Sequence, residues 1–126
     1  MKKKIIRSIF IIMLLFGIAC IEGNSIAKIE FPKEVDFGII RKGDTINKEI
    51  IIKNVSEKTL IIKNLHSSCN CTAVKLKDSV IDTDSETIIT ATFVANGSNN
   101  NFEESIVLES NTKPIFSIIN LKGKIK

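Results

Sequence analysis

The stretch Thr45–Asn54 has the sequence T-I-N-K-E-I-I-I-K-N and decides the fold class of this chain. Its side chains alternate, with Ile46, Ile50 and Ile52 on one face and mainly polar residues on the other. Successive side chains of a β-strand point to opposite faces of a sheet. This period of two therefore predicts a strand with one buried face.

β-Branched residues also dominate the segments on both sides of this stretch, and Gly, Asn, Asp and Ser divide them into short runs. We predict further strands at residues 29–31, 35–39, 59–65, 86–94, 102–110 and 115–125. Their expected core residues are Ile89, Ala91, Phe93, Ile106, Leu108, Ile115, Ile119 and Leu121. No segment has a helical period. Seven or eight short strands with turns at near-regular spacing predict an all-β fold, an immunoglobulin-like β-sandwich.

The first nineteen residues have the composition of an export signal. Basic residues at positions 2–4 and 7 precede an apolar run at 9–16, and small residues follow it. The run is shorter than the roughly 20 apolar residues that a bilayer crossing needs. An uncleaved anchor helix is the alternative, because Ile18 and Ile21 extend the apolar run.

The sequence Gly17-Ile18-Ala19-Cys20 resembles a bacterial lipobox, in which the signal is cut before a cysteine whose sulfur carries diacylglycerol. Ala19 and Cys20 match this pattern, and Gly17 occupies the position where Leu is usual. We therefore expect a signal peptide at residues 1–19, a tether with lipidated Cys20 at 20–28 and the domain at 29–126. The alternative is an unmodified Cys20 with cleavage after Ala27.

The net positive charge of the whole chain comes from the expected signal segment. The 126 residues of the chain contain 18 Lys and Arg against 14 Asp and Glu, but the expected signal contains four of the basic residues and no acidic one. The remainder, with 14 of each sign, lacks the basic surface that nucleic-acid binding needs. A single histidine excludes a zinc site with several imidazole ligands.

The pair Cys69 and Cys71 is the one motif in the sequence whose side chains could carry out chemistry. In the oxidising compartment of an exported protein a local disulfide is favoured. On an extended strand the two Cα atoms would lie roughly 6.5 Å apart, so such a bond needs a bend. A second interpretation is a copper or zinc site in which His66 joins the two thiolates. A third is two small apolar side chains that only pack. We expect His66 to lie in an exposed loop, and no spacing specifies a Cys–His catalytic pair.

Several short motifs together resemble a known family. They are Val35-Asp36-Phe37-Gly38, Lys42-Gly43-Asp44, Lys53-Asn54 and Ser68-Cys69-Asn70-Cys71-Thr72. The chain resembles the bacterial family called domain of unknown function 1573 from about residue 29 to residue 126. The S-C-x-C-T motif is the most specific part of this resemblance. Asn70 takes the place of a usual Gly, and the turn near Asp84 lacks the usual Pro-Gly.

The resemblance implies an immunoglobulin-like module related to major-sperm-protein and pilus-chaperone domains, with no established activity. Many members are exported lipoproteins. The sequence thus predicts a lipid-anchored, non-catalytic module of the bacterial cell envelope that binds an unidentified envelope protein. We expect no cofactor and no nucleic acid. The alternative is a thiol-redox or copper-handling lipoprotein that uses Cys69, Cys71 and His66, with copper or zinc as its cofactor.

Overall fold

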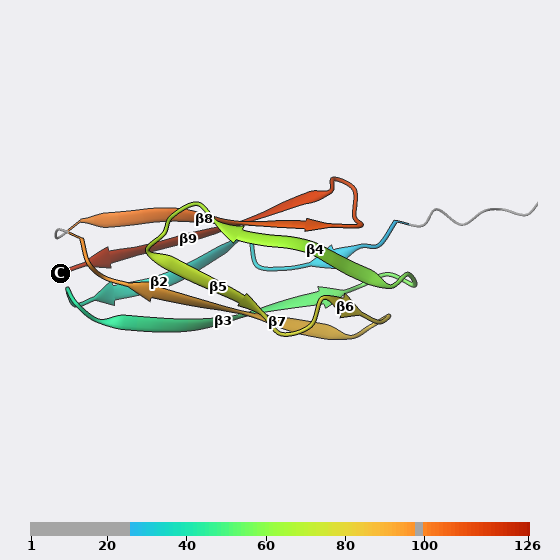
Figure 1. The fold of residues 1–126 in the computed structure, drawn as a ribbon, viewed down its shortest axis with the longest axis horizontal. Coiled ribbons are helices and arrows are strands. Elements are labelled where there is room, and N and C mark those ends of the chain that lie inside the picture. Colours follow the sequence, from blue (N-terminus) through green and yellow to red (C-terminus); the bar gives the residue numbers. More distant parts are fainter. Residues whose placement is uncertain (1–25, 98–99) are drawn as a thin grey trace, which may run out of the picture.

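A computed structural model describes residues 26–97 and 100–126 of the chain (Figure 1). The expected signal segment and Cys20 lie outside these residues. The described part is built from strands, and no helix in it could span a membrane. The strands are β1 (Ile29–Glu30), β2 (Glu34–Ile40), β3 (Thr45–Asn54), β4 (Leu60–Ser67), β5 (Thr72–Leu76), β6 (Val80–Ile81), β7 (Glu86–Val94), β8 (Asn101–Ser110) and β9 (Phe116–Ile125).

Two sheets pack face to face with their strands along the long axis of the domain (Figure 1). The four-stranded sheet has the order β1-β3-β7-β5, and the five-stranded sheet has the order β2-β9-β8-β4-β6. Neighbouring strands are antiparallel except β2 and β9, which are parallel. The predicted all-β immunoglobulin-like sandwich is confirmed. The seven segments with predicted bounds correspond to β1–β4 and β7–β9, and β5 and β6 bring the number of strands in the described residues to nine.

Alternate side chains of both sheets fill the space between them. Strand β3 pairs with β7 so that Ile50 lies opposite Ile89, and both are fully buried. Each strand therefore buries one face, as the period of two predicted. The largest fully buried apolar side chains are Ile40, Ile50, Ile52, Leu60, Ile89, Ile106, Leu108, Ile119 and Leu121.

One predicted core residue is wrong. Ile115 is 52% exposed, whereas Ile119 and Leu121 of the same segment are buried. The strand begins one residue later, at Phe116, so Ile115 belongs to the connection between β8 and β9. Its main-chain carbonyl accepts a hydrogen bond from the Ser110 N–H, and the alternation of the strand does not extend to its side chain.

The Asp-Phe-Gly motif of β2 has a clear structural role. The N–H of Gly38 donates to Asp36 Oδ1 at 2.7 Å, and Gly38 has φ of +72°, which glycine adopts without strain. This local turn shifts the register between β2 and β9 and directs Phe37 into the core. There the Phe37 ring lies 5.9 Å from the Phe93 ring and 6.0 Å from the Phe102 ring, in the tilted geometries that aromatic pairs prefer.

Two of the predicted turns also need a left-handed residue. Gly43, in the turn that follows β2, has φ of +92°. Asp84, in the turn before β7, has φ of +58°, at the place where the family usually has Pro-Gly. Aspartate is one of the few residues other than glycine that tolerate this conformation, so the turn forms without the usual pair.

Asn54 is a buried polar residue that connects two turns at one end of the sandwich. Its side-chain amide donates to the carbonyl oxygens of Lys58, Ile81 and Asp82 at 2.7, 3.0 and 3.2 Å. Its side-chain oxygen accepts from the N–H and the hydroxyl of Ser56. One side chain thus ties the β3–β4 turn to the β6–β7 turn.

The residues just before β1 also contact the sandwich. Ala27 is buried, forms a bridge with Thr112, and donates its N–H to the Asn111 carbonyl at 3.1 Å. The chain then pairs with the four-stranded sheet through β1 and with the five-stranded sheet through β2. The first two strands therefore pair with different sheets, and the segment between them crosses from one sheet to the other.

Candidate functional site at the Cys69–Cys71 disulfide

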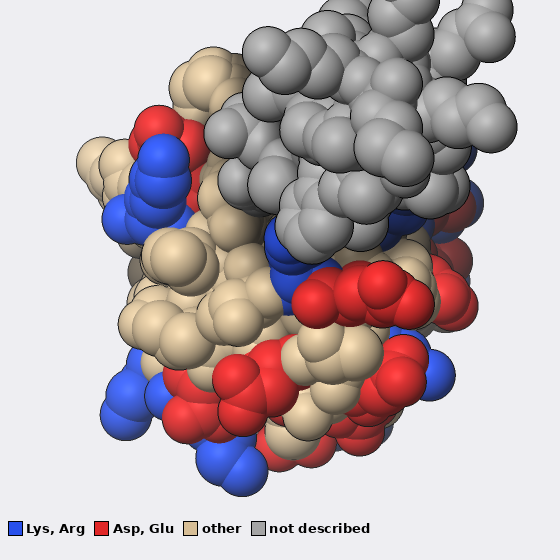
Figure 2. Space-filling view, turned by 90° about the vertical axis from the view of Figure 1, so that its right-hand side faces the viewer, with Lys and Arg blue, Asp and Glu red and all other residues tan. Residues whose placement is uncertain are grey.

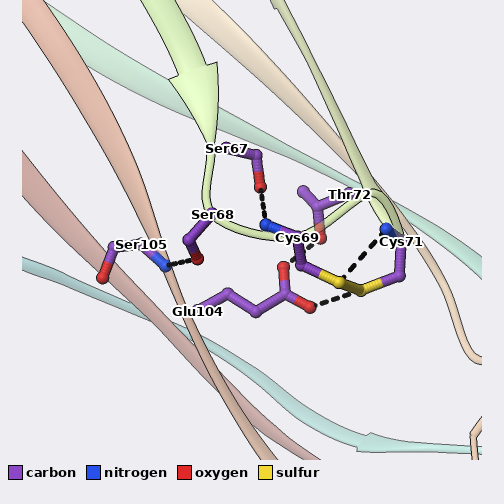
Figure 3. The surroundings of a disulfide bond; sticks show 7 residues. All are labelled: Ser67, Ser68, Cys69, Cys71, Thr72, Glu104 and Ser105. Carbon is purple, nitrogen blue, oxygen red and sulfur yellow. Dashed lines mark hydrogen bonds between the residues drawn. A yellow bond between two sulfur atoms is a disulfide. The ribbon is translucent and has the colours of Figure 1, made fainter.

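The two cysteines lie in the bend that connects β4 with β5, and their sulfurs form a disulfide (Figure 3). The Thr72 N–H donates to the Cys69 carbonyl at 3.3 Å, which closes a tight turn. This turn brings the two Cα atoms to 5.3 Å, well within the range for a disulfide. Asn70 is not among the described residues with positive φ, so this turn does not need the glycine that is usual there.

The carboxylate of Glu104 faces the disulfide from the five-stranded sheet (Figure 3). Glu104 Oε1 lies 2.6 Å from Cys71 Sγ, and Glu104 Oε2 accepts a hydrogen bond from the Thr72 hydroxyl. Only 9% of the glutamate remains exposed. Within the described ranges the one ion pair joins Lys122 and Glu34, so no cation within salt-bridge distance neutralises Glu104. The Thr72 hydroxyl is therefore the hydrogen-bond donor to the carboxylate, since the disulfide-bonded Cys71 sulfur carries no proton.

Sequence reasoning missed Glu104, although a signal for it was present. On β8 the buried residues Ile106 and Leu108 fix the face that points inward, and Glu104 is two residues before Ile106 on the same face. A glutamate in phase with core residues is unusual, because burying a carboxylate is costly unless it has partners. Its partners, Cys71 and Thr72, come from a different segment and could not be read from the local pattern.

His66 is not part of this site. It is an exposed residue of β4, opposite Val107 of β8, so the expectation of a loop was wrong although the side chain is exposed. Among residues 26–97 and 100–126, three potential metal donors lie within 4.8 Å of one another: the Cys69 and Cys71 sulfurs and a Glu104 oxygen. If the pair is reduced, these two sulfurs and one carboxylate are the donors offered to a soft metal such as zinc or Cu(I). His66 does not join them.

A depression of about 390 Å³ that is open to solvent lies beside this site. It reaches Glu104 and is otherwise lined by side chains such as Ser68, Glu103, Ser105 and Asn120. A further tie holds the bend against β8, since the Ser105 N–H donates to the Ser68 hydroxyl at 2.9 Å. Among the described residues, the site is therefore a disulfide and a carboxylate held between two sheets, beside an open depression.

The architecture defines a class of protein, the immunoglobulin-like and PapD-like β-sandwiches. A protein of unknown function from Porphyromonas gingivalis W83 has a similar structure, with a TM-score of 0.74 and 16% identity over 86% of this chain and 51% of the other. A PapD-like (ASH) domain of human CEP192 has a TM-score of 0.67 and 12% identity over 86% of this chain and 92% of the other. This chain thus spans about half the length of the Porphyromonas protein.

The chain belongs to the family described as protein of unknown function (DUF1573), whose model matches residues 29–125. The resemblance seen in the sequence motifs is thereby confirmed. No curated protein matches the sequence. At these levels of identity the solved structures support the fold alone.

Proposed function

We propose that this chain is a non-catalytic, lipid-anchored module of the bacterial cell envelope that binds another envelope protein through the outer face of its five-stranded sheet. The observation that carries the proposal is a group of exposed apolar side chains on that face. Phe116 and Ile118 of β9 are 50% and 53% exposed, and Val107 of β8 lies opposite Ile118. Exposed apolar groups of this kind mark sites of protein interaction.

A second exposed pair lies on the same outer face, toward the other edge of the five-stranded sheet. Ile61 of β4 and Val80 of β6 face each other across the two strands, and both are exposed. Asn64 of β4 and Glu109 of β8 lie between this pair and Phe116. The outer face of the sheet therefore carries a mixture of apolar and polar groups. Protein interfaces have this mixture.

One edge of each sheet is less suited to a partner than this face. At one edge of the four-stranded sheet β5 presents Lys75, and Lys77 follows it. At one edge of the five-stranded sheet β2 is kinked at Gly38, where its register shifts. Lysines and bulges at edge strands hinder the addition of a further strand.

We expect a photo-crosslinking side chain at Phe116 or Ile118 to give a discrete protein adduct in intact cells. The matched control is Ile51, which is similarly exposed at 52% but lies on the four-stranded sheet. Mass spectrometry of the adducts measures the outcome. Equal yields from Ile51 and Phe116, or adducts with lipid only, would contradict a protein-binding face.

Burial of Ala27 supports cleavage before Cys20. Cleavage after Ala27 would remove a core residue and its hydrogen bond to Asn111, whereas cleavage before Cys20 leaves both in place. A lipidated Cys20 would connect the domain to the membrane through a few residues. Two or more acyl chains are sufficient for stable anchoring.

The end of the domain nearest this attachment carries exposed side chains of both signs (Figure 2). The β3–β4 turn contributes Glu57 and Lys58, the β6–β7 turn contributes Asp82 and Asp84, and the β8–β9 connection contributes Lys113.

Replacing Cys20 with alanine is expected to abolish incorporation of labelled palmitate and to release the protein from membranes. The reason is that the acylated sulfur is lost while the domain is unchanged. Cys69→Ala is the matched control and should keep the label. Palmitate label that persists in Cys20→Ala would show that the proposed anchor is wrong.

A further inference from the structure

The disulfide and Glu104 form a group that the proposed binding function does not use. The two sulfurs differ in their surroundings, although they are only two residues apart. The Cys71 N–H points to Cys69 Sγ at 3.2 Å, whereas Cys71 Sγ lies 2.6 Å from Glu104 Oε1 (Figure 3). A backbone N–H stabilises a thiolate, so negative charge is favoured on Cys69. A carboxylate disfavours negative charge on Cys71 and can accept a proton from its thiol.

We propose that Cys69 and Cys71 form a reversible thiol–disulfide exchange site in which Cys69 reacts with external thiols and disulfides and Glu104 takes the proton of Cys71. This activity is separate from the proposed binding to an envelope protein. Its substrates are thiols and disulfides of low molecular weight or on the surface of another protein. In the part of the chain that the structure describes, the depression beside Glu104 is open to solvent and could admit them.

Glu104 is well placed for the transfer of a proton. Its second oxygen accepts the Thr72 hydroxyl, and Thr72 is buried at the start of β5. The glutamate and the threonine belong to different sheets, so the carboxylate is fixed between the two layers. A positioned group within hydrogen-bond distance of the sulfur satisfies the geometric requirement for a general base.

The oxidative direction proceeds in two steps. The Cys69 thiolate first attacks an external disulfide RS–SR, forms the mixed disulfide Cys69–S–SR and releases RS⁻. The Cys71 sulfur then attacks the Cys69 sulfur with its electron pair while its proton passes to the Glu104 carboxylate. The bond between Cys69 sulfur and SR breaks, and a second RS⁻ leaves with that electron pair. Cys69 and Cys71 are oxidised together by two electrons, and RS–SR is reduced to two thiolates.

The reductive direction reverses these steps with an external thiol as the reductant. Its thiolate attacks Cys69, and the departing Cys71 sulfur recovers the proton from Glu104. The turn closed by the Thr72 N–H holds the two Cα atoms 5.3 Å apart in the oxidised form. A turn that persists on reduction makes the ring-closing step intramolecular and therefore fast.

The experiment uses the full chain, reduced and purified in detergent, and oxidised glutathione as the probe. Samples are quenched with acid, and peptide mapping by mass spectrometry follows the mixed disulfide and the closed disulfide over time. Mapping also scores Cys20 separately. Glu104→Gln keeps the shape of the side chain and removes its ability to accept the proton. The matched control is Glu103→Gln, which changes the exposed neighbour on the opposite face of β8.

We expect Glu104→Gln to slow ring closure by about a hundredfold, at the lower end of what positioned acid–base groups contribute. The glutathione adduct should then accumulate on Cys69, while the first step keeps its rate and Glu103→Gln behaves like the wild type. Closure at the wild-type rate in a folded Glu104→Gln protein would overturn the role of Glu104.

A second measurement does not depend on the folding of the Glu104 variant. In the wild-type chain and in Cys71→Ser, the first glutathione adduct should form on Cys69. Cys69→Ser, which leaves Cys71 beside the carboxylate, should react at least about tenfold more slowly. Equal reactivity of the two single-cysteine variants, or preferential labelling of Cys71, would contradict the assignment of Cys69 as the reactive sulfur. Either of these two outcomes would leave the proposal of a protein-binding face on the five-stranded sheet unchanged, because that face contains neither cysteine.

Discussion

Ile52→Asp is expected to unfold the domain. Ile52 is 0% exposed and lies in the centre of the sandwich, so the substitution removes an apolar side chain from the core and places a carboxylate there without a partner. The loss of the buried side chain costs about 2–5 kcal/mol, and an unpaired buried charge adds several kcal/mol. The sum is comparable to the whole stability of a small domain, about 5–15 kcal/mol.

The neighbouring residue provides the control for this result. Ile51 points to solvent and is 52% exposed, so Ile51→Asp should cost about 1 kcal/mol or less. The chain has no Trp or Tyr, so unfolding is best measured by far-ultraviolet circular dichroism or calorimetry. A cooperatively folded Ile52→Asp together with an unfolded Ile51→Asp would mean that the buried face of β3 has been assigned the wrong way round.

Asn54→Ala is expected to destabilise the domain by about 3–5 kcal/mol. The substitution leaves the Ile81 carbonyl without its side-chain donor in a buried position, and the Lys58 and Asp82 carbonyls without theirs in part-buried positions. Each buried polar group that loses its partner costs about 1–3 kcal/mol. The tie between the β3–β4 and β6–β7 turns is lost as well.

Two further variants test this account of Asn54. Asn54→Asp keeps an oxygen that Ser56 can bond but cannot donate to the carbonyls, so it should be no more stable than Asn54→Ala. Asn64→Ala is the matched control, because Asn64 is exposed and its side chain bonds only the adjacent Leu65 N–H among the contacts found. It should change stability by less than about 1 kcal/mol. Equal melting temperatures for Asn54→Ala and Asn64→Ala would refute the proposed role.

The fold followed from the sequence because each long strand carries its own signal. Thr45–Asn54 was predicted with the ends that the structure has, since its alternation is regular and turn residues bound it on both sides. Ile115 was misplaced because the alternation was extended beyond the end of its strand. The position of a strand end depends on the hydrogen bonds of the following turn, which an apolar pattern does not encode.

The candidate site could be predicted only in part. Cys69 and Cys71 were visible because their spacing is local, and the bend that joins them was recognised as a requirement. Glu104 was not found, because its contact with Cys71 spans 33 residues and crosses from one sheet to the other. His66 seemed a suitable ligand because it is near in sequence, yet its place on β4 opposite Val107 separates it from the sulfurs. Nearness along the chain is a poor guide to side-chain contact in a β-strand, because successive side chains point to opposite faces of the sheet.

The way in which β1 and β2 join different sheets also has a mechanical consequence. The strands run along the long axis (Figure 1), so a pull on the N-terminal end along that axis would act parallel to β1 and β2. Their ladder bonds to β3 and β9 lie across the direction of pull and would share the load, whereas a sideways pull would break them one after another. A domain tethered at this end would thus resist stretching between its anchor and a bound partner.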